Sequence, residues 1–197
     1  MKILCCLTFF VLCTLLISIR DAEAQRIQML TEAGGITFEL YPDKAPVTVA
    51  NFLKYVDQKK FDGTVFYRVV RMDNQPVSKV KIEVIQGGLN KDTTERLSPI
   101  VHEITSKTGL KHLDWTLSMA RTVPGSASSE FFICINPQPE LDYQGARNPD
   151  GQGFAAFGQV IEGMNVVRQI QAGQTGENEE IQLLKRPIKI ITVRRLD

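Results

Sequence analysis

The chain has 197 residues, 43% of them hydrophobic, and its 23 Lys and Arg residues nearly balance 22 Asp and Glu residues. This length fits one compact domain, and this composition is too hydrophobic for a disordered chain. No block of like charge stands out, so the sequence predicts neither a nucleic-acid partner nor a polybasic membrane patch.

The first 24 residues have the features of a secretory signal peptide. Lys2 supplies a positive charge, an apolar run covers 3–19, and Ala22 and Ala24 form the small-x-small pattern of a cleavage site. We therefore expect a signal peptide over 1–24, a domain over 25–197, and an exported protein that is either periplasmic or secreted. The alternative is an uncleaved anchor, because the apolar run reaches the lower limit of about 17 residues for a membrane helix. We expect no membrane contact beyond this segment.

The cysteines predict a domain without a disulfide. Cys5, Cys6 and Cys13 fall in the signal segment, so Cys134 alone would remain in the mature chain. Cys134 lies in an apolar run over 131–135, where a thiol is expected to pack as a small hydrophobic side chain.

Eight short runs rich in Ile, Val and Phe, separated by Gly, Pro and Asp, predict β-strands. They cover 26–31, 36–41, 65–70, 80–86, 115–120, 131–135, 154–161 and 188–193. Helical spacing of apolar residues predicts two helices, over 46–57 with Pro46 in the first turn and over 164–170. We therefore predict a mainly β fold, a closed eight-stranded antiparallel barrel capped by two α-helices, since closure removes exposed strand edges.

Six phrases carry a resemblance to a known family. They lie at 36–52, 61–70, 85–88, 117–120, 129–134 and 154–164. In this order and spacing they resemble the cyclophilin family of peptidyl-prolyl cis-trans isomerases, and the resemblance covers about 27–196. The family's eight-stranded barrel with two helices agrees with the fold predicted from the sequence pattern.

The chemistry that this resemblance implies needs no cofactor and no metal. Rotation about an X–Pro amide has a barrier of about 18–20 kcal/mol, because the C–N bond has partial double-bond character. An apolar pocket for the proline ring and a fixed donor that favours the twisted transition state are sufficient to lower it. A metal site is not expected, because His102 and His112 have no cysteine cluster or metal-binding motif beside them.

The resemblance implies three catalytic residues. Arg68 is the donor, Gln86 orients it and contacts the peptide backbone, and Phe132 forms the floor of the proline pocket. Strand alternation predicts that the Arg68 side chain faces away from Tyr67 and Val69.

Six further positions match substrate-binding residues of the family, with a packing role as the alternative for each: Val84, Ala120, Arg121, Glu130, Leu141 and Phe154. Alternation along 130–133 predicts that Glu130 and Phe132 face the groove while Phe131 and Ile133 fill the barrel.

The sequence departs from the family pattern beside the predicted groove. A longer segment over 71–84 replaces a short connection, and Glu83 and Glu140 stand where aromatic residues are common. Glu130 replaces a neutral glutamine. Its carboxylate would either form an ion pair with Arg68 or favour basic residues next to the substrate proline.

Two functions follow from these features. The first is a monomeric prolyl isomerase that acts on proline-containing segments of unfolded or partly folded exported proteins. The alternative is a catalytically weak proline-peptide-binding or chaperone module. The acidic residues at 83, 130 and 140 motivate this alternative, whereas Arg68, Gln86 and Phe132 favour the enzyme.

Overall fold

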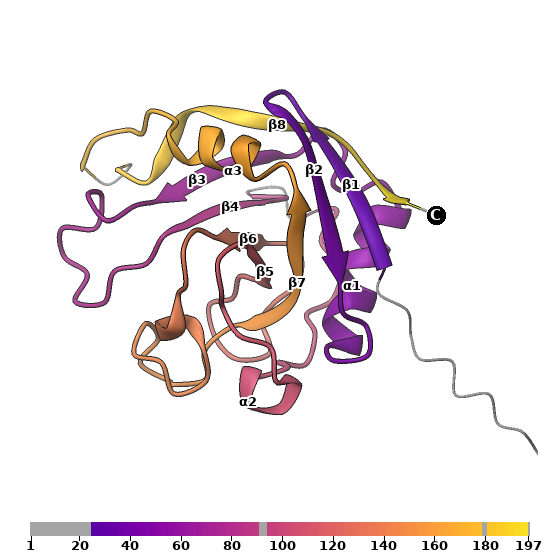
Figure 1. Cartoon of the computed structure of the whole chain (residues 1–197), viewed down its shortest axis with the longest axis horizontal. Coiled ribbons are helices and arrows are strands. Elements are labelled where there is room, and N and C mark those ends of the chain that lie inside the picture. The colour runs from indigo at the N-terminus through magenta and orange to yellow at the C-terminus, as the bar shows by residue number, and fades with distance from the viewer. Residues whose placement is uncertain (1–24, 91–93, 179–180, 197) are drawn as a thin grey trace, which may run out of the picture.

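The computed structural model describes residues 25–90, 94–178 and 181–196, so the predicted signal segment 1–24 lies outside the described residues. The described residues form eight strands in a closed barrel with the order β1-β2-β7-β5-β6-β4-β3-β8, and every neighbouring pair is antiparallel (Figure 1). The strands are β1 (Gln25–Thr31), β2 (Gly34–Leu40), β3 (Val65–Val70), β4 (Val84–Gly88), β5 (Thr116–Met119), β6 (Phe131–Cys134), β7 (Ala155–Glu162) and β8 (Leu183–Leu196). The predicted closed barrel is confirmed.

Both predicted helices are present, as α1 (Pro46–Asp57) and α3 (Met164–Gln171). Helix α1 packs against β7 and β8, and α3 packs against β2, β3 and β4. Two shorter helices, α2 (Thr105–Thr108) and the 3-10 helix η1 (Pro139–Leu141), were not predicted, because so few residues show no periodicity. None of the helices within the described ranges is long and apolar enough to cross a membrane.

Strand β4 begins later than the sequence pattern predicted, because side chains form hydrogen bonds with the backbone of the residues before it. The Gln75 amide accepts from the Ile82 N–H (3.2 Å) and donates to the Ile82 carbonyl (2.8 Å). The Arg147 guanidinium donates to the Val80 carbonyl (2.6 Å). These contacts satisfy the backbone of 80–82 without a neighbouring strand, so regular pairing begins at Val84.

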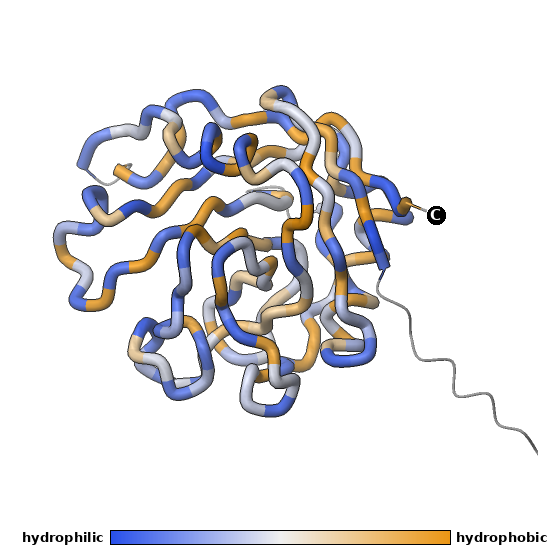
Figure 2. The backbone as a smooth tube through the Cα atoms, viewed as in Figure 1, coloured by the Kyte–Doolittle hydropathy of each residue, from blue (hydrophilic) through white to orange (hydrophobic). Residues whose placement is uncertain are grey.

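Alternation along the strands divides the apolar residues between two sides of the barrel wall, and Figure 2 shows hydrophobic and hydrophilic residues succeeding one another along the chain. In β6, Phe131 and Ile133 belong to the main core inside the barrel. Phe132 and Cys134 belong to a second, smaller cluster on the other side of the sheet. The predicted separation of Phe132 from its neighbours is confirmed, and Cys134 is fully buried, as expected for a packing residue.

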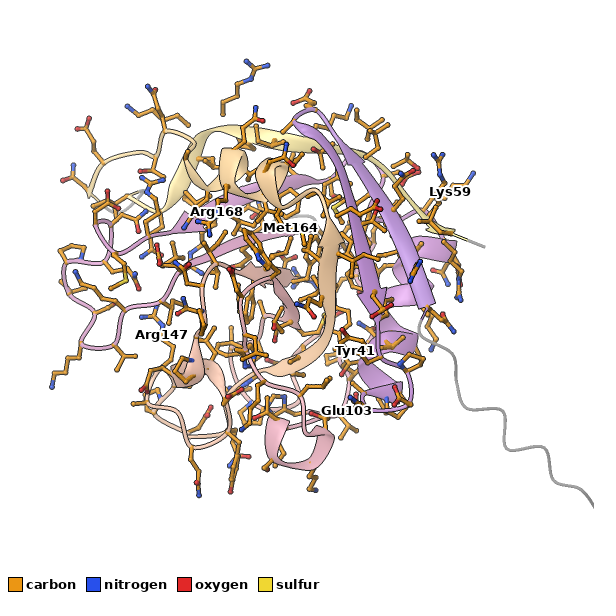
Figure 3. The ribbon with its side chains drawn as sticks, viewed as in Figure 1. Tyr41, Lys59, Glu103, Arg147, Met164 and Arg168 are labelled. Carbon is orange, nitrogen blue, oxygen red and sulfur yellow. The ribbon has the colours of Figure 1, made fainter. Side chains whose placement is uncertain are left out.

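Helix α1 closes part of the barrel, and its first turn is capped from a distant segment. Its N-cap residue, Ala45, has no side chain that could accept a hydrogen bond. The Glu103 carboxylate instead accepts from the backbone N–H groups of Val47 (3.2 Å) and Thr48 (2.7 Å), close to the start of the helix (Figure 3). It also accepts from the Thr48 hydroxyl (2.6 Å). A negative charge at a helix N-terminus satisfies unpaired donors and complements the helix dipole.

We expect Glu103→Ala to lower the free energy of unfolding by about 1–2 kcal/mol, because the first turn of α1 loses the carboxylate that accepts from two of its backbone N–H groups. Urea unfolding of the domain over 25–197 measures this change. Glu177→Ala is the matched control, because Glu177 is exposed and forms no ion pair with another described residue. Equal midpoints for the two variants would show that Glu103 does not stabilise the helix.

Candidate active site

Two adjoining pockets lie on the outer side of the barrel wall, at the second apolar cluster. The first has a volume of about 230 Å³, and the second about 270 Å³. They share Gln86, Ala120 and Arg121, so together they form one groove. Eight of the nine predicted site residues line the first pocket and Glu130 lines the second. The structure therefore brings together residues that are up to 86 positions apart in the chain, from Arg68 to Phe154.

Aromatic and aliphatic side chains form the floor of the first pocket. The rings of Phe132 and Phe154 meet edge to face, with centroids 5.3 Å apart. Val84 and Leu141 pack beside Phe132 in the same cluster, and both are buried. Ile82, which the sequence analysis did not select, also lines this pocket. Such a floor can hold an apolar ring that offers no hydrogen-bond donor, as proline does.

Arg68 lies at the edge of this pocket and is held by two neutral amides. Its Nη1 donates to Gln86 Oε1 (2.8 Å), and its Nε and Nη2 both donate to Gln182 Oε1 (3.0 and 2.5 Å). Burial lowers the pKa of Arg68 from its usual range; Tyr67 opposes this shift, and the positive charge of Arg147 adds to it. An arginine starts from so high a value that it keeps its charge at neutral pH. The site therefore holds a fixed cation beside an apolar floor.

The prediction that Arg68 faces away from Tyr67 is wrong, and a β-bulge is the reason. The pairing of β3 with β4 runs from Phe66↔Gly87 to Arg68↔Gln86, which leaves Tyr67 without a partner. The extra residue breaks the period-two alternation, so Tyr67 and Arg68 reach the same side chain, that of Gln86. The other half of the prediction holds, because Val69 lies in the barrel core.

Tyr67 connects Gln86 to Glu130. The Tyr67 hydroxyl donates to Glu130 Oε2 (2.6 Å) and accepts from Gln86 Nε2 (2.6 Å). An ionised carboxylate can only accept, so this arrangement leaves Gln86 Oε1 directed at Arg68. Burial and the Glu130 charge raise the pKa of Tyr67 well above its usual range, and its hydroxyl stays protonated.

The expected ion pair between Glu130 and Arg68 does not occur among the described residues. The second Glu130 oxygen accepts from the Asn90 backbone N–H (2.9 Å) and the Ser129 hydroxyl (3.1 Å). The carboxylate is therefore satisfied without Arg68, and its influence on that arginine passes through Tyr67 and Gln86. The other idea, a preference for basic residues beside the substrate proline, stays a prediction.

Arg121 is held in place as part of the groove wall. Its guanidinium forms a two-pronged pair with Asp150 (2.7 and 2.8 Å), and its Nε donates to the Gly153 carbonyl (2.8 Å). The Arg121 contact lowers the pKa of Asp150 to about 2. The guanidinium carbon also lies 5.3 Å from the centre of the Phe154 ring. Its own charge is thus paired, unlike that of Arg68.

Glu83 does not enter the pocket. Its carboxylate accepts from the side-chain amides of Asn136 (2.8 Å) and Gln171 (3.4 Å). Its neighbours Ile82 and Val84 line the pocket instead. Alternation along 82–86 was the available signal for Ile82, because it places Ile82 on the same face as Val84 and Gln86.

Three further residues at the first pocket could not be selected from the sequence: Arg147 and Asn148, which line it, and Gln182, which bonds to Arg68. They come from long loops, and no periodicity or local motif marks where a loop side chain will point. The described residues hold no group of three or more His, Cys, Asp or Glu side chains able to hold a metal ion.

A buried histidine supports the pocket floor from beneath. The His112 ring stacks on Phe132, with centroids 6.0 Å apart and planes at 15°. Its Nδ1 lies 2.8 Å from Asp142 Oδ1, and its Nε2 lies 2.9 Å from the Ser118 hydroxyl. A neutral imidazole fits both partners, since Nδ1–H donates to the carboxylate while Nε2 accepts from the hydroxyl. Ser118 is completely buried, so this group braces the floor and offers no nucleophile to the groove.

We expect the stability of the domain to fall as the pH drops below about 6.5, and His112 to contribute to that fall. Burial lowers the pKa of His112 from 6.5, although Asp142 opposes this shift and Lys111 adds to it. Below pH 6.5 the unfolded chain therefore binds a proton at His112 more readily than the folded chain does. The contribution of His112 to the free energy of unfolding is complete above pH 6.5 and is lost as the pH falls from 6.5 towards the lower pKa of the folded state. The slope from one such group is at most about 1.4 kcal/mol per pH unit.

Urea unfolding between pH 7.5 and 5.0 measures this slope for the natural chain and for His112→Asn, which removes the titrating ring. We expect the variant to be less stable at pH 7.5 and to have the flatter slope. Parallel slopes would show that another group controls the response to acid.

The comparisons with known proteins agree with this geometry. A family model described as "Cyclophilin type peptidyl-prolyl cis-trans isomerase/CLD" matches residues 26–195. A peptidyl-prolyl cis-trans isomerase of Streptomyces antibioticus is 37% identical over 77% of this chain and 86% of its own length. One from Acinetobacter baylyi is 36% identical over 91% of this chain and 89% of its own. A third, from Escherichia coli, is 34% identical over 75% and 85%.

A solved structure shows the same fold. The crystal structure of a Cryptosporidium parvum cyclophilin type isomerase superposes with a TM-score of 0.68 and 20% identity, covering 88% of this chain and 98% of the other. The family match over nearly the whole described barrel, together with relatives above 30% identity, decides the assignment. This chain belongs to the cyclophilin-type peptidyl-prolyl cis-trans isomerases and is an enzyme of that class.

Proposed function

We propose that the groove binds proline-containing segments of unfolded or partly folded polypeptides, and that Arg68, Gln86 and Phe132 carry the catalysis. The proline ring would lie on the floor around Phe132, and the chain beside it would extend into the second pocket past Ala120. The shared lining of the two pockets supports an extended ligand, because a peptide entering one pocket continues directly into the other.

One observation carries this proposal, namely the hydrogen bonding of Arg68. A buried arginine is usually paired with a carboxylate, because an unpaired buried charge is costly. Here two amide oxygens accept from three of its five N–H groups, and no ion pair to Arg68 occurs in the described parts of the chain. The guanidinium is therefore fixed in position with its net positive charge available to a ligand.

Such a cation suits the rotation of an X–Pro amide. In the twisted transition state the amide nitrogen no longer shares its lone pair with the carbonyl, so it becomes a better hydrogen-bond acceptor. A donor fixed beside the pocket binds this state more strongly than the planar ground state, which is the requirement for catalysis. Gln86 would keep the donor in place, and the apolar floor would hold the ring while the preceding residue rotates.

We expect Arg68→Ala to lower kcat/KM for a short X–Pro peptide by about 100- to 1,000-fold, the usual loss on removing a transition-state donor. The assay compares the mature domain and the variant, with circular dichroism to show that both are folded. Arg186→Ala is the matched control, since Arg186 is exposed and lines neither pocket of the groove. An Arg68→Ala variant with full activity would refute its role. A natural chain that binds proline peptides without accelerating rotation would favour the binding-module alternative.

We also propose that residues 1–24 direct export and are removed, so that the enzyme acts on folding proteins outside the cytoplasm. The charge, apolar run and Ala22-Glu23-Ala24 pattern of the sequence support this. Strand β1 begins at Gln25, so cleavage after Ala24 would leave the barrel whole. Uncatalysed X–Pro rotation takes tens to hundreds of seconds and can limit folding, which gives such an enzyme a use in an export compartment.

Mass spectrometry of the protein from its native cells tests the export proposal. We expect the mature chain to begin at Gln25 and to be recovered from the periplasm or the medium. A chain that keeps Met1 and stays with the membrane fraction would support the uncleaved anchor instead. A chain that keeps Met1 in the cytoplasm would contradict export altogether.

A further inference from the structure

The segment 71–83, which is the part of the departing stretch 71–84 that precedes β4, contacts the catalytic arginine indirectly through one side chain. Gln182 lies just before β8, and its Oε1 accepts from both Nε and Nη2 of Arg68. Its Nε2 donates to the Asn74 carbonyl (3.1 Å), and its backbone carbonyl accepts from the Val69 N–H (2.9 Å). An amide that donates on one side must present its oxygen on the other, so Asn74 fixes which end of Gln182 faces Arg68.

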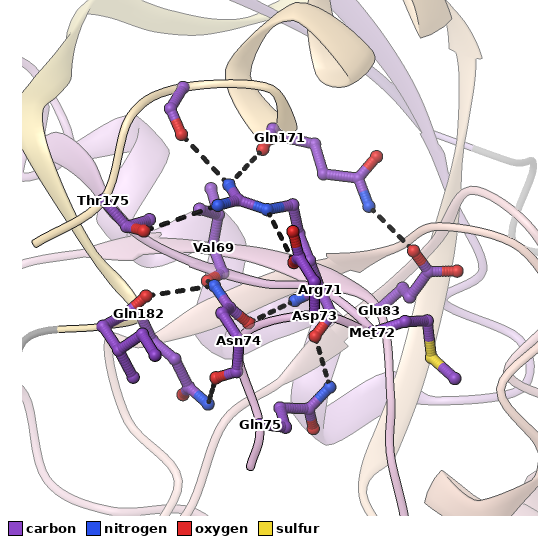
Figure 4. Close-up of polar contacts among 12 residues, drawn as sticks. Val69, Arg71, Met72, Asp73, Asn74, Gln75, Glu83, Gln171, Thr175 and Gln182 are labelled. Carbon is purple, nitrogen blue, oxygen red and sulfur yellow. Dashed lines mark hydrogen bonds and ion pairs between the residues drawn. The ribbon is translucent and has the colours of Figure 1, made fainter. Parts of the chain in front are cut away.

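Asn74 is itself held on three sides, as Figure 4 shows. It is 3% exposed. Its Nδ2 donates to the carbonyls of Val69 (3.0 Å) and Ile181 (3.2 Å), and its Oδ1 accepts from the Arg71 backbone N–H (2.7 Å). These bonds join the end of β3, the segment 71–83 and the chain leading into β8. Asn74 therefore fixes the chain immediately on both sides of the Arg68–Gln182 contact.

Arg71 anchors the same segment to the end of helix α3. Its Nη1 donates to the carbonyls of Gln171 (2.9 Å) and Gly173 (3.0 Å), and its Nη2 donates to the Thr175 hydroxyl (3.4 Å) (Figure 4). Carbonyls at the end of a helix lack backbone partners, and a positive charge there is favourable. The start of the segment is thus held by both α3 and β3.

We propose that Gln182 is a positioning residue for Arg68, and that the segment 71–83 holds it in place through Asn74. The inference rests on the proposed role of Arg68. Gln182 satisfies two of the guanidinium donors without neutralising their charge, and it restricts rotation of the side chain about its long axis. Gln86 alone, bonded to a single Nη, would leave that rotation open. Misplacing a catalytic group by about 1 Å can cost about 100-fold in rate.

The test uses Gln182→Ala and Gln182→Met, of which the second keeps most of the volume without the acceptor. We expect kcat/KM for an X–Pro peptide to fall about tenfold in both, within the loss expected for a misplaced group, and mainly through kcat. In an Arg68→Ala background, the same substitutions should change the rate by less than twofold. Gln58→Ala is the matched control, because Gln58 is exposed and lines neither pocket of the groove.

The NMR signal of the Arg68 Nε–H group gives a readout that overall stability does not determine. In the natural chain this proton is bonded to Gln182, so its signal should be sharp and slow to exchange with water. Gln182→Met should shift the signal and speed its exchange. Asn74→Ala should do so in the same direction and to a lesser extent, and Gln58→Ala should leave it unchanged.

Three results would overturn the inference: a folded Gln182→Met variant with a rate within twofold of the natural chain, an equal loss in the Arg68→Ala background, or an unchanged Nε–H signal. An unchanged signal in Asn74→Ala alone would overturn the role of the segment 71–83. Failure of the proposed role of Arg68 can be distinguished from failure of this inference. In that case Arg68→Ala would keep full activity, whichever residue stands at position 182.

Discussion

The buried guanidinium of Arg68 is the constraint on which the rest of the groove depends. Burial makes its charge costly unless hydrogen bonds offset the lost hydration, yet a carboxylate partner would neutralise the charge that a peptide amide needs. Two amide oxygens, from Gln86 and Gln182, meet both demands. An amide can turn end for end, however, so each requires a further contact to fix its orientation. Tyr67 fixes the orientation of the Gln86 amide, and Asn74 fixes that of the Gln182 amide. The polar residues around Arg68 are explained by the need for these two contacts.

The barrel supplies this site by giving each strand two different faces. Strands β4 and β6 place one set of side chains in the core and the next set in the groove, so Phe131 and Phe132 serve separate apolar clusters. The floor is then as rigid as the wall from which it projects. Beneath it, the group around His112 replaces apolar packing with satisfied hydrogen bonds. The site is therefore preorganised, and little ordering remains to be done when a peptide binds.

Alternation and helical spacing were sufficient to predict the eight strands, both longer helices and the two faces of β6, because these patterns follow directly from burial. The sequence could not predict the bulge at Tyr67, since one extra residue in a strand leaves no mark in the hydrophobic pattern. Gln182 was equally hidden, because it reaches Arg68 from a position 114 residues away through a loop. Arg68, Gln86 and Phe132 were selected through resemblance, and geometry alone explains how Arg68 and Gln86 are held.

Glu130 shows how a change of charge can be absorbed without an ion pair. A carboxylate beside an arginine would ordinarily bind it directly, but here the Tyr67 hydroxyl and the Asn90 N–H satisfy its oxygens first. Hydrogen bonds in a chain polarise one another, so a charged acceptor at one end strengthens each bond along it. The Glu130 charge makes the Tyr67 oxygen a better acceptor for Gln86, and the Gln86 oxygen in turn a better acceptor for Arg68. Glu130, one of the acidic residues that motivated the alternative of a catalytically weak module, therefore helps to keep Arg68 in position.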